Sequence, residues 1–412
     1  MLLISLFKKM IKDFMIYNNG DWMEIQNPIS IGIIGGGQLG KMIAQEAKRM
    51  SFRVIILDPS PNSPASSVSD ECIIADFKDG DAITTLANKS DVLTYEIELA
   101  NSDILENLSS KNFIVHPSPQ TLRIIQNKFR QKTFLKDHGI PVAQFDLVKS
   151  KKDLSNLCDR FGYPSILKIC ENSYDGRGNY IIRTENNILQ CADYLSNRQC
   201  MVEKFIPFEK EISVMIARNP SGQISSFPIA ENIHHNNILD TTIVPARISH
   251  TTVAKAQELA EKTMKALKGS GIFGIEMFVT KEEQVLINEI APRPHNSGHY
   301  SIEACSISQF EQHLRAILDL PLSKPELLSP AVMVNILGPE GCSGPYMIMG
   351  LKELLSIAGV KLHIYGKMIC SPRRKLGHIT VTASSLEKAI ATADKIKNII
   401  KIKDVNKVNK NR

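Results

Sequence analysis

A glycine-rich turn between an apolar run and a helical pattern constrains the fold of this chain more than any other feature. Residues 31–34 are apolar and read as a buried strand, and the string GGGQLG follows at 35–40. Apolar residues recur at helical spacing over 41–50, and a second apolar strand pattern ends at Asp58. Because strands that alternate with helices pair in parallel, we predict a doubly wound parallel α/β sheet over 29–125.

The turn at 35–40 spells G-x-G-x-x-G, with Asp58 about one helix and one strand further on. Such a turn brings backbone N–H groups toward a phosphate at a helix N-terminus. The same turn serves nicotinamide dinucleotides, other phosphates, or close packing alone, so all three interpretations stay open. We favour a contact with the sugar phosphate of a substrate, through Gly37, Gln38 and Leu39.

The rest of the chain changes character, because short strands follow one another with fewer helices between them. An amphipathic helix is predicted over 251–268 and paired strands over 271–280 and 284–290. The boundaries that we predict are an extension expected to be disordered over 1–28, the first α/β domain over 29–125, a small lid domain over 126–205, a large domain with a C-terminal substrate-binding part over 206–405, and a basic tail over 406–412.

A polar, glycine-containing loop over 173–179 (SYDGRGN) follows a predicted strand that carries Lys168 near its end. Glycine allows backbone amides to turn toward an anion, and Arg177 adds a fork of donors. A lysine on a strand followed by such a loop is typical of a mobile lid over ATP phosphates. It is not a Walker A loop, because the Gly-Lys-Ser/Thr ending is missing. An exposed hairpin turn is the alternative, but it does not account for Lys168 and Arg177 together.

Two glutamates face each other if the strands 271–280 and 284–290 form a hairpin. With a two-residue turn at 282–283, Glu276 falls opposite Glu289, with Cβ atoms roughly 5 Å apart. Two carboxylates at that distance repel each other and need a counter-charge. Mg²⁺ is the natural one, because proteins hold it with one or two carboxylates plus substrate phosphates.

The residues around the two glutamates bear on this interpretation. Asn288 can supply a further oxygen ligand. In the two-residue register Phe278 and Ile287 share the glutamates' face, which argues against a solvated pair on an outer surface. If the turn has three residues instead, the pairing fails and Asn288 takes the place of Glu289.

A polar loop follows directly, with the sequence APRPHNSGHY at 291–300. Two prolines stiffen it, and such a concentration of polar side chains is typical of a substrate site. Arg293 can hold a phosphate or carboxyphosphate, and His295 can move a proton. A metal site built from His295 and His299 is the weaker interpretation. Lys375, in a later basic cluster, is a candidate phosphate ligand beside the usual interpretation as a solvated run.

Composition excludes several classes of function. The chain has a net charge of +6, but it lacks aromatic residues interleaved with basic runs, so we predict no nucleic-acid partner. Its eight cysteines are scattered without a Cys-x-x-Cys pair, which favours small buried hydrophobes in a reducing compartment. The first apolar run is too short to span a membrane, and we predict a cytoplasmic protein with no membrane partner.

Taken together, the motifs resemble the ATP-grasp superfamily and, within it, the aminoimidazole ribonucleotide carboxylating synthetases. The resemblance extends over nearly the whole chain, from about residue 31 to about residue 383. The strings that carry it are IIGGGQLG at 33–40, LTYEIE at 93–98, YDGRG at 174–178, NEIAPRPHNSGHY at 288–300, SQFEQHLRA at 308–316 and RKLGH at 374–378.

The resemblance implies three domains, with ATP between the second and the third, and Mg²⁺ on Glu276 and Glu289. Residues implied around the nucleotide are Lys128, Lys168, Ser173, Tyr174, Asp175, Gly176, Arg177, Gly178, Asn179, Glu203, Lys204, Phe205, Ile206, Glu211, His234, Asn288 and Glu289. Residues implied at aminoimidazole ribonucleotide or the carboxylating intermediate are Tyr174, Arg177, Arg293, His295, Asn296, Lys375 and one acid of Glu96 and Glu98, of which we favour Glu98.

The implied reaction is the carboxylation of the amine of aminoimidazole ribonucleotide with ATP and bicarbonate, through carboxyphosphate, in purine biosynthesis. The family is usually a homodimer. Because no second catalytic domain is evident after residue 405, we expect a separate downstream mutase. The chain departs from the family pattern at Lys128, Ser173 and Asn179, where arginine, glycine and glutamine are usual, and these departures bear on nucleotide affinity.

Three alternatives make different predictions. Another ATP-grasp ligase, a formate-dependent transformylase or a biotin-carboxylase-like protein would share the glutamate pair but not the string PRPHNSGH. A nicotinamide-dependent dehydrogenase would rest on the turn at 35–40 and leave the glutamates and the lid without a role. A catalytically inactive scaffold would have no need of Lys168, Glu276, Glu289 and Arg293.

Overall fold

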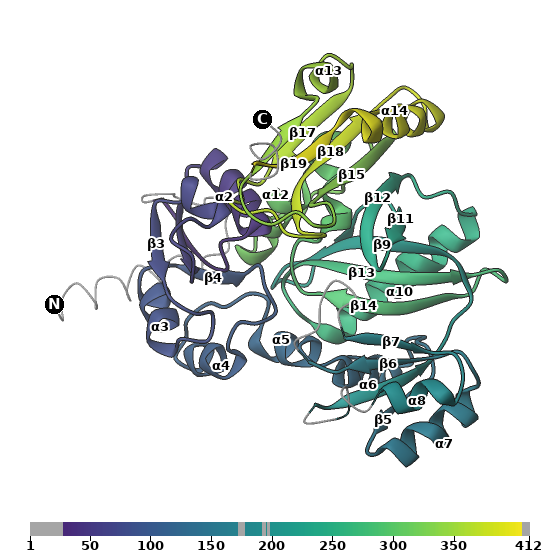
Figure 1. Cartoon of the computed structure of the whole chain (residues 1–412). Coiled ribbons are helices and arrows are strands. Elements are labelled where there is room, and N and C mark those ends of the chain that lie inside the picture. Colours follow the sequence, from purple (N-terminus) through teal and green to yellow (C-terminus); the bar gives the residue numbers. More distant parts are fainter. Residues whose placement is uncertain (1–27, 172–177, 192–194, 196–197, 406–412) are drawn as a thin grey trace.

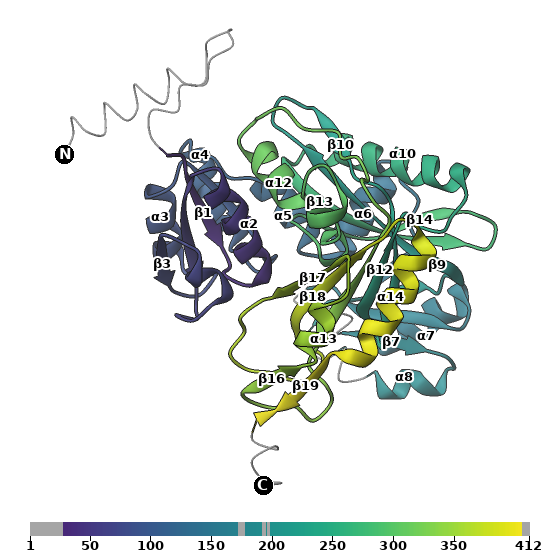
Figure 2. The ribbon, with the colours of Figure 1, turned by 90° about the horizontal axis from the view of Figure 1, so that it is seen from above.

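The computed structural model describes residues 28–171, 178–191, 195 and 198–405. Figure 1 shows three regions: an N-terminal unit, a small sheet with its helices, and a large sheet that continues into the C-terminal part. Seen from above, the N-terminal unit lies beside the large sheet rather than on top of it (Figure 2). None of the described helices has both the length and the apolar character needed to cross a membrane.

The N-terminal unit is built on a parallel four-stranded sheet with strand order β3-β2-β1-β4. Ile31 and Ile33 of β1 are fully buried against helix α2, while Ile34 faces the opposite layer. The predicted doubly wound parallel sheet is therefore confirmed. Its elements are β1 (Ser30–Ile34), α2 (Gln38–Arg49), β2 (Arg53–Asp58), η1 (Pro64–Ser67), β3 (Glu71–Ile74), α3 (Gly80–Asn88), β4 (Val92–Tyr95), α4 (Ser102–Ser110) and α5 (Pro119–Ile125).

The small unit holds an antiparallel four-stranded sheet with strand order β5-β8-β6-β7. Leu154 and Leu157 of α7 pack on Leu167 and Val202 of this sheet, so the helix covers one face and leaves the other toward the large sheet. Its elements are α6 (Lys128–Asp137), β5 (Phe145–Val148), α7 (Lys151–Phe161), β6 (Ser165–Ile169), β7 (Asn179–Ile182), α8 (Asn186–Gln190) and β8 (Cys200–Lys204).

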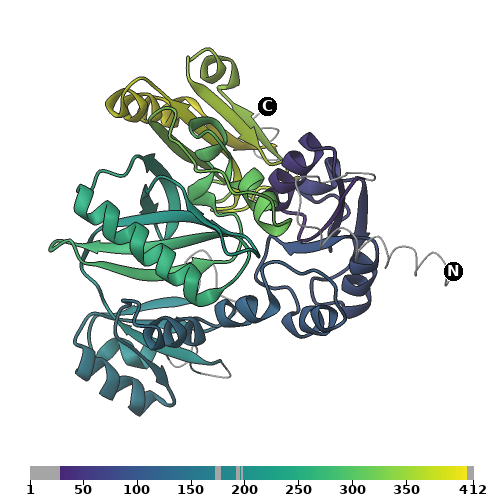
Figure 3. The same cartoon turned by 180° about the vertical axis from the view of Figure 1, so that it is seen from behind.

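The large sheet has nine strands and runs β14-β13-β9-β11-β12-β15-β18-β17, with β10 paired to β9. Helix α10 covers one face, where Ala260 and Met264 pack on Val214 and Phe273 (Figure 3). Its elements are β9 (Phe208–Arg218), β10 (Ile224–Ser226), β11 (Ala230–His235), β12 (Ile238–Val244), α10 (His250–Leu267), β13 (Gly271–Thr280), β14 (Val285–Ala291), η2 (Asn296–Gly298), α11 (Ser301–Ala304), α12 (Gln309–Ile317), β15 (Ala331–Leu337), α13 (Leu351–Leu355), β17 (Val360–Ile364), β18 (Lys375–Thr382) and α14 (Leu386–Ile399).

Helix packing connects the N-terminal unit to the region of the large sheet. Helix α12 packs against α2 of the N-terminal unit through Phe310 and Leu314, which share one core with Ile43. A separate two-stranded sheet pairs β16 (Tyr346–Met349) with β19 (Lys401–Asp404). The predicted boundaries after 125 and 205 fall between α5 and α6 and between β8 and β9, and we keep them as our proposal for the domains.

The cysteines lie as predicted from their scatter along the chain. All eight are free, and all except Cys72 are buried. They act as small apolar side chains in the cores, where burial also raises the pKa of thiols such as Cys170.

Candidate functional site

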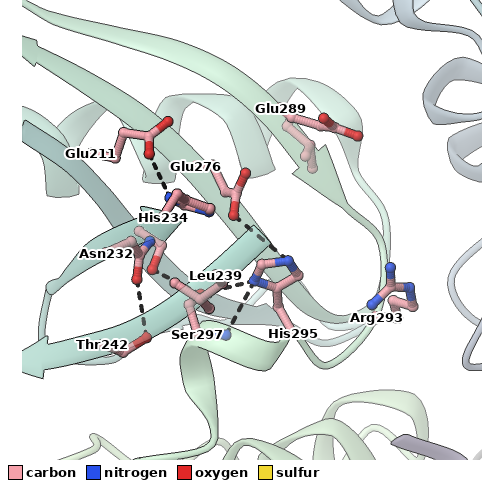
Figure 4. Close-up of polar contacts among 12 residues, drawn as sticks. Glu211, Asn232, His234, Leu239, Thr242, Glu276, Glu289, Arg293, His295 and Ser297 are labelled. Atoms are coloured by element: carbon pink, nitrogen blue, oxygen red, sulfur yellow. Dashed lines mark hydrogen bonds and ion pairs between the residues drawn. The ribbon is translucent and has the colours of Figure 1, made fainter. Parts of the chain in front are cut away.

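The candidate site lies where the hairpin of β13 and β14 faces α6 and the small sheet, next to the loop that follows β14. Figure 4 shows Glu276 and Glu289 on neighbouring strands, with His295 and Arg293 of the loop beside them. Glu211 and His234 extend the same surface across the sheet onto β9 and β11.

The hairpin reaches the predicted glutamate pairing by a different register. Its turn contains three residues, because the Thr280 N–H donates to the Gln284 carbonyl at 3.0 Å and Glu283 adopts a left-handed φ of 55°. The prediction of a two-residue turn is therefore wrong. A β-bulge beyond Glu276 shifts the register by one residue and brings Glu276 directly opposite Glu289.

The bulge also changes which side chains share the glutamates' face. Ile287 pairs with Met277 and is fully buried in the core under α10, so its predicted place beside the glutamates is wrong. Phe278 is partly exposed and stacks on Phe208 with ring centroids 4.6 Å apart. The physical reason is that one extra residue in a strand reverses the facing of everything on one side of it.

The two glutamates are compensated unequally. The Lys128 ammonium lies 2.9 Å from Glu289 Oε2, and despite burial it holds the pKa of Glu289 below its usual range. Burial, with added repulsion from Glu289 and Glu211, raises the pKa of Glu276 to about 7, although His234 and Lys375 oppose the rise. His295 Nε2 lies 3.7 Å from Glu276 Oε1, too far for a hydrogen bond.

This donor set fits Mg²⁺. Two carboxylates and the partly exposed Asn288 amide lie together, and the raised pKa of Glu276 shows that its charged form lacks compensation in the protein alone. In the part of the chain that the structure describes, no cluster of three or more His, Cys, Asp or Glu side chains is arranged to hold a metal ion. Substrate oxygens would therefore complete the coordination of a cation held by Glu276 and Glu289.

A buried cationic cluster lies on the small-sheet side of the site. Glu203, only 2% exposed, accepts from Lys168 at 2.6 Å and lies 3.2 Å from Lys132. Burial alone would raise the pKa of Glu203, but the two lysines lower it to about 2. Lys168 also reaches Asn288 Oδ1 at 3.5 Å and so connects this cluster to the glutamate hairpin.

Sequence reasoning missed Lys132. It lies one helical turn after Lys128 in α6, and residues four apart share one face of a helix. That spacing was the signal that would have found it. Its Nζ also donates to the Ile287 carbonyl at 3.2 Å, so α6 is tied directly to β14.

Strands β9 and β11 contribute Glu211 and His234 to the site. His234 Nδ1 lies 2.5 Å from Glu211 Oε2, and the glutamate raises the pKa of His234 against the effect of burial. Asn232 lies beside them (Figure 4) and was also missed. Its Oδ1 accepts from Thr242 at 3.2 Å, while its buried Nδ2 has no hydrogen-bond partner among the described residues.

The structure distinguishes Glu96 from Glu98. The Glu96 carboxylate accepts from the N–H groups of Gly37 and Gly40, and burial raises its pKa to about 7 although these donors oppose the rise. Glu98 instead lies 2.8 Å from the Arg293 guanidinium. Arg293 belongs to the polar loop over 291–300, which we call the substrate loop. The favoured assignment of Glu98 agrees with this geometry.

The same contacts alter the interpretation of the glycine-rich turn. The Gly37 amide donates to Glu96, and the Gly36 amide donates to Asp58 at 2.8 Å. Leu39, predicted near the substrate, is 5% exposed and packs in the core under α2. In this structure the turn therefore binds carboxylates of its own chain, and Gln38 is the partly exposed member of the predicted trio.

The substrate loop holds buried polar groups that lack partners in the protein. Asn296 is 6% exposed, and neither its Oδ1 nor its Nδ2 has a hydrogen-bond partner among the residues described. A buried amide left in that state is costly, so a ligand is the natural partner. Lys375 begins β18 on the neighbouring part of the sheet, and its charge influences Glu276, His234 and His299.

The lid prediction falls largely outside the described residues, since Ser173, Tyr174, Asp175, Gly176 and Arg177 are not among them. The end of the lid is described. Gly178 precedes β7, whose first residue, Asn179, pairs with Lys168, and Asn179 Oδ1 is buried without a hydrogen-bond partner in the described structure. Of the predicted residues that follow Glu203, Lys204 ends β8, and Phe205 and Ile206 lie in the connection to β9.

Comparisons with known families agree with this arrangement. Residues 29–126 match the ribonucleotide synthetase preATP-grasp domain and residues 133–310 match the ATP-grasp domain. Residues 331–392 match the phosphoribosylaminoimidazole carboxylase C-terminal domain. The three matches follow one another in the order that the resemblance implied.

Individual relatives cover nearly the whole chain. N5-carboxyaminoimidazole ribonucleotide synthase of Bacillus subtilis is 44% identical over 85% of this chain and 90% of its own length. The crystal structure of the synthetase from Thermotoga maritima has a TM-score of 0.84 and 47% identity, and the match covers 91% of this chain and 99% of that one.

A third comparison concerns a structure with ligands. The Aspergillus clavatus N5-carboxyaminoimidazole synthase, in complex with ADP and 5-aminoimidazole ribonucleotide, matches with a TM-score of 0.84 and 36% identity over 90% of this chain and 98% of that one. With the glutamate hairpin, the buried lysines and the substrate loop in place, these likenesses show that the chain belongs to the N5-carboxyaminoimidazole ribonucleotide synthase family of ATP-grasp enzymes.

Proposed function

We propose that this protein carboxylates the exocyclic amine of 5-aminoimidazole ribonucleotide in purine biosynthesis, using ATP and bicarbonate and releasing ADP and phosphate. The observation that carries the proposal is the direct opposition of Glu276 and Glu289, with Lys128, Lys168 and the substrate loop around them. Family membership and the ligands of the Aspergillus clavatus relative support the choice of substrate.

The first step forms carboxyphosphate. A bicarbonate oxygen attacks the γ-phosphorus of ATP, the bond from that phosphorus to the β,γ-bridging oxygen breaks, and ADP leaves with the electron pair. Lys128 and Lys168 place positive charge beside the glutamate hairpin, where the phosphates would lie. Mg²⁺ held by Glu276 and Glu289 would neutralise phosphate charge.

The second step transfers the carboxyl group. The bond between carbon and the phosphate oxygen of carboxyphosphate breaks and yields carbon dioxide and phosphate. The amine nitrogen of aminoimidazole ribonucleotide then bonds to that carbon and loses a proton. Arg293, His295 and Asn296 lie together on the loop after β14, where they can orient the two reactants.

The remaining roles are assigned as proposals. We assign to nucleotide binding the predicted lid, which ends at Asn179, and the residues Glu203, Lys204, Phe205, Ile206, Glu211, His234 and Asn288. We assign to binding of the ribonucleotide the side chains of Glu98, Gln38 and Lys375, together with Tyr174 and Arg177 of the predicted lid. We also expect bicarbonate as the carbon source, a homodimer, a separate mutase that uses the product, and a cytoplasmic location.

Phosphate release from ATP tests the proposal. With Mg²⁺ and bicarbonate present, adding 5-aminoimidazole ribonucleotide should stimulate release strongly. Stimulation by formate in place of bicarbonate would instead favour a transformylase. Absence of any stimulation in folded protein that binds ATP would contradict the proposed acceptor.

A further inference from the structure

Two buried serines form a chain of hydrogen bonds that ends at the His295 ring. Ser297 Oγ lies 2.8 Å from His295 Nδ1, and Ser213 Oγ donates to Ser297 Oγ at 2.8 Å. Ser213 is 1% exposed and Ser297 is fully buried. In Figure 4 the ring lies between Ser297 on one side and Glu276 on the other.

These contacts specify which ring nitrogen carries the proton. The backbone N–H of Ser297 points at His295 Nδ1 at 3.4 Å, and an amide nitrogen can only donate. Because Ser297 Oγ already accepts from Ser213, its own hydroxyl proton is free to point at Nδ1 as well. Nδ1 is therefore the acceptor, and the neutral ring carries its proton on Nε2.

The backbone of the loop is held by a different residue. Gln309 of α12 accepts from the His295 N–H at 2.9 Å and donates to the His295 carbonyl at 2.8 Å. This two-way contact fixes the main chain of His295 independently of its ring. The serines are thus left with one separable task, which is to orient and polarise the imidazole.

We propose that Ser297, supported by Ser213, is a positioning residue that holds His295 with an N–H, and not a lone pair, directed into the site beside Glu276. The inference rests on the proposed function for its kinetic consequence. In that reaction His295 acts as a hydrogen-bond donor to an oxygen of carboxyphosphate or of the departing phosphate. It does not take the proton from the amine while it is in this form.

Kinetics of single and double variants test the proposed chain of contacts from Ser213 through Ser297 to His295. Ser297→Ala should lower kcat for 5-aminoimidazole-ribonucleotide-dependent phosphate release about five- to tenfold, the range of one hydrogen bond, with little change in KM for ATP. Ser213→Ala should have a smaller effect, and the double variant should be no worse than Ser297→Ala. Ser225→Ala on β10, which removes a hydroxyl that donates to the Ser323 carbonyl at 2.7 Å and makes no contact with His295, serves as the matched control.

A His295→Ala background separates positioning from structural support. There Ser297→Ala should change kcat no further, because the ring on which it acts is gone. An equal loss in both backgrounds, or no loss in the wild-type background, would overturn the proposal.

Nitrogen NMR of histidine-labelled protein tests the same inference without turnover, so failure of the proposed function would not affect it. At about pH 8, where histidine is normally neutral, the His295 signals identified by their loss in His295→Ala should show a protonated Nε2. Ser297→Ala should shift them toward a mixture of tautomers, and Ser213→Ala should do so to a lesser degree. A protonated Nδ1 in the wild-type protein would refute the proposed role of Ser297.

Discussion

Replacing Glu203 with glutamine should destabilise the protein strongly. The side chain is 2% exposed and is the shared partner of Lys132 and Lys168. Glu203→Gln keeps the shape but leaves two buried ammonium groups without the carboxylate, and unpaired buried charge is costly. The buried lysines can limit that cost by releasing a proton.

The magnitude follows from the pKa of Glu203, which the lysines lower from 4.5 to about 2 despite burial. That difference corresponds to roughly 3 kcal/mol of stability near neutral pH. Because the folded-state pKa is depressed, this contribution is present above the unfolded value of 4.5 and is lost as the pH falls toward 2. If the chain unfolds as one unit, about 3 kcal/mol lowers Tm by roughly 3–4 °C.

Thermal unfolding of Glu203→Gln and wild-type protein between about pH 7 and pH 3 measures this effect, because the contribution of the ion pairs is lost below the unfolded pKa of 4.5. The difference in Tm should be largest near neutral pH and shrink as the wild-type protein loses its ion pairs in acid. Glu261→Gln is the matched control, since Glu261 pairs with Lys265 at 3.4 Å on the surface and should change Tm little. A Glu203→Gln variant within about 1 °C of wild type at neutral pH would refute the reasoning.

Other substitutions test the remaining parts of the site. Glu289→Ala should reduce Mg²⁺-dependent phosphate release about a hundredfold or more without loss of fold, whereas Glu282→Ala in the exposed turn should not; full activity of Glu289→Ala would remove the proposed metal role. Lys375→Ala should raise KM for 5-aminoimidazole ribonucleotide more than KM for ATP, and steady-state kinetics showing the opposite order would contradict its placement. Gly37→Ala would put a Cβ in steric overlap with Glu96 Oε1, so it should lower Tm by displacing that carboxylate, and an unchanged Tm would show that the contact is unimportant.

Local sequence patterns predicted much of the fold. The strand predicted over 31–34 lies within β1 (Ser30–Ile34), and the second predicted strand ends at Asp58 as β2 does, because short apolar runs between polar residues define buried strands closely. The helix predicted over 251–268 spans His250–Leu267, since its apolar stripe has the period of a helix. These features depend on neighbours in sequence, which is why they could be predicted.

The register of the glutamate hairpin could not be predicted in the same way. Hydrophobic periodicity reveals neither a three-residue turn nor a bulge. Each shifts the pairing by one residue, and the two shifts cancel at Glu276 and Glu289. The prediction of opposed glutamates thus holds although its assumed register was wrong. Ile287, on the turn side of the bulge, shows where that register fails.

Long-range polar partners were also beyond sequence reasoning. Ser213 and Ser297 are 84 residues apart and meet only because β9 lies beneath the loop after β14. The Gly37 amide is bound by Glu96, 59 residues away, so a turn that suggested phosphate instead binds an internal carboxylate. Such contacts depend on how whole elements pack, and no local spacing encodes them.

The transfer of oxygen from bicarbonate to phosphate tests the central claim most directly. Bicarbonate labelled with a heavy oxygen isotope is supplied with ATP, Mg²⁺ and 5-aminoimidazole ribonucleotide, and the released phosphate is examined by mass spectrometry. The proposed mechanism predicts that each phosphate formed in response to the ribonucleotide carries one oxygen from bicarbonate, because that oxygen bridges carbon and phosphorus in carboxyphosphate. Ribonucleotide-stimulated phosphate that carries only unlabelled oxygen would contradict the mechanism.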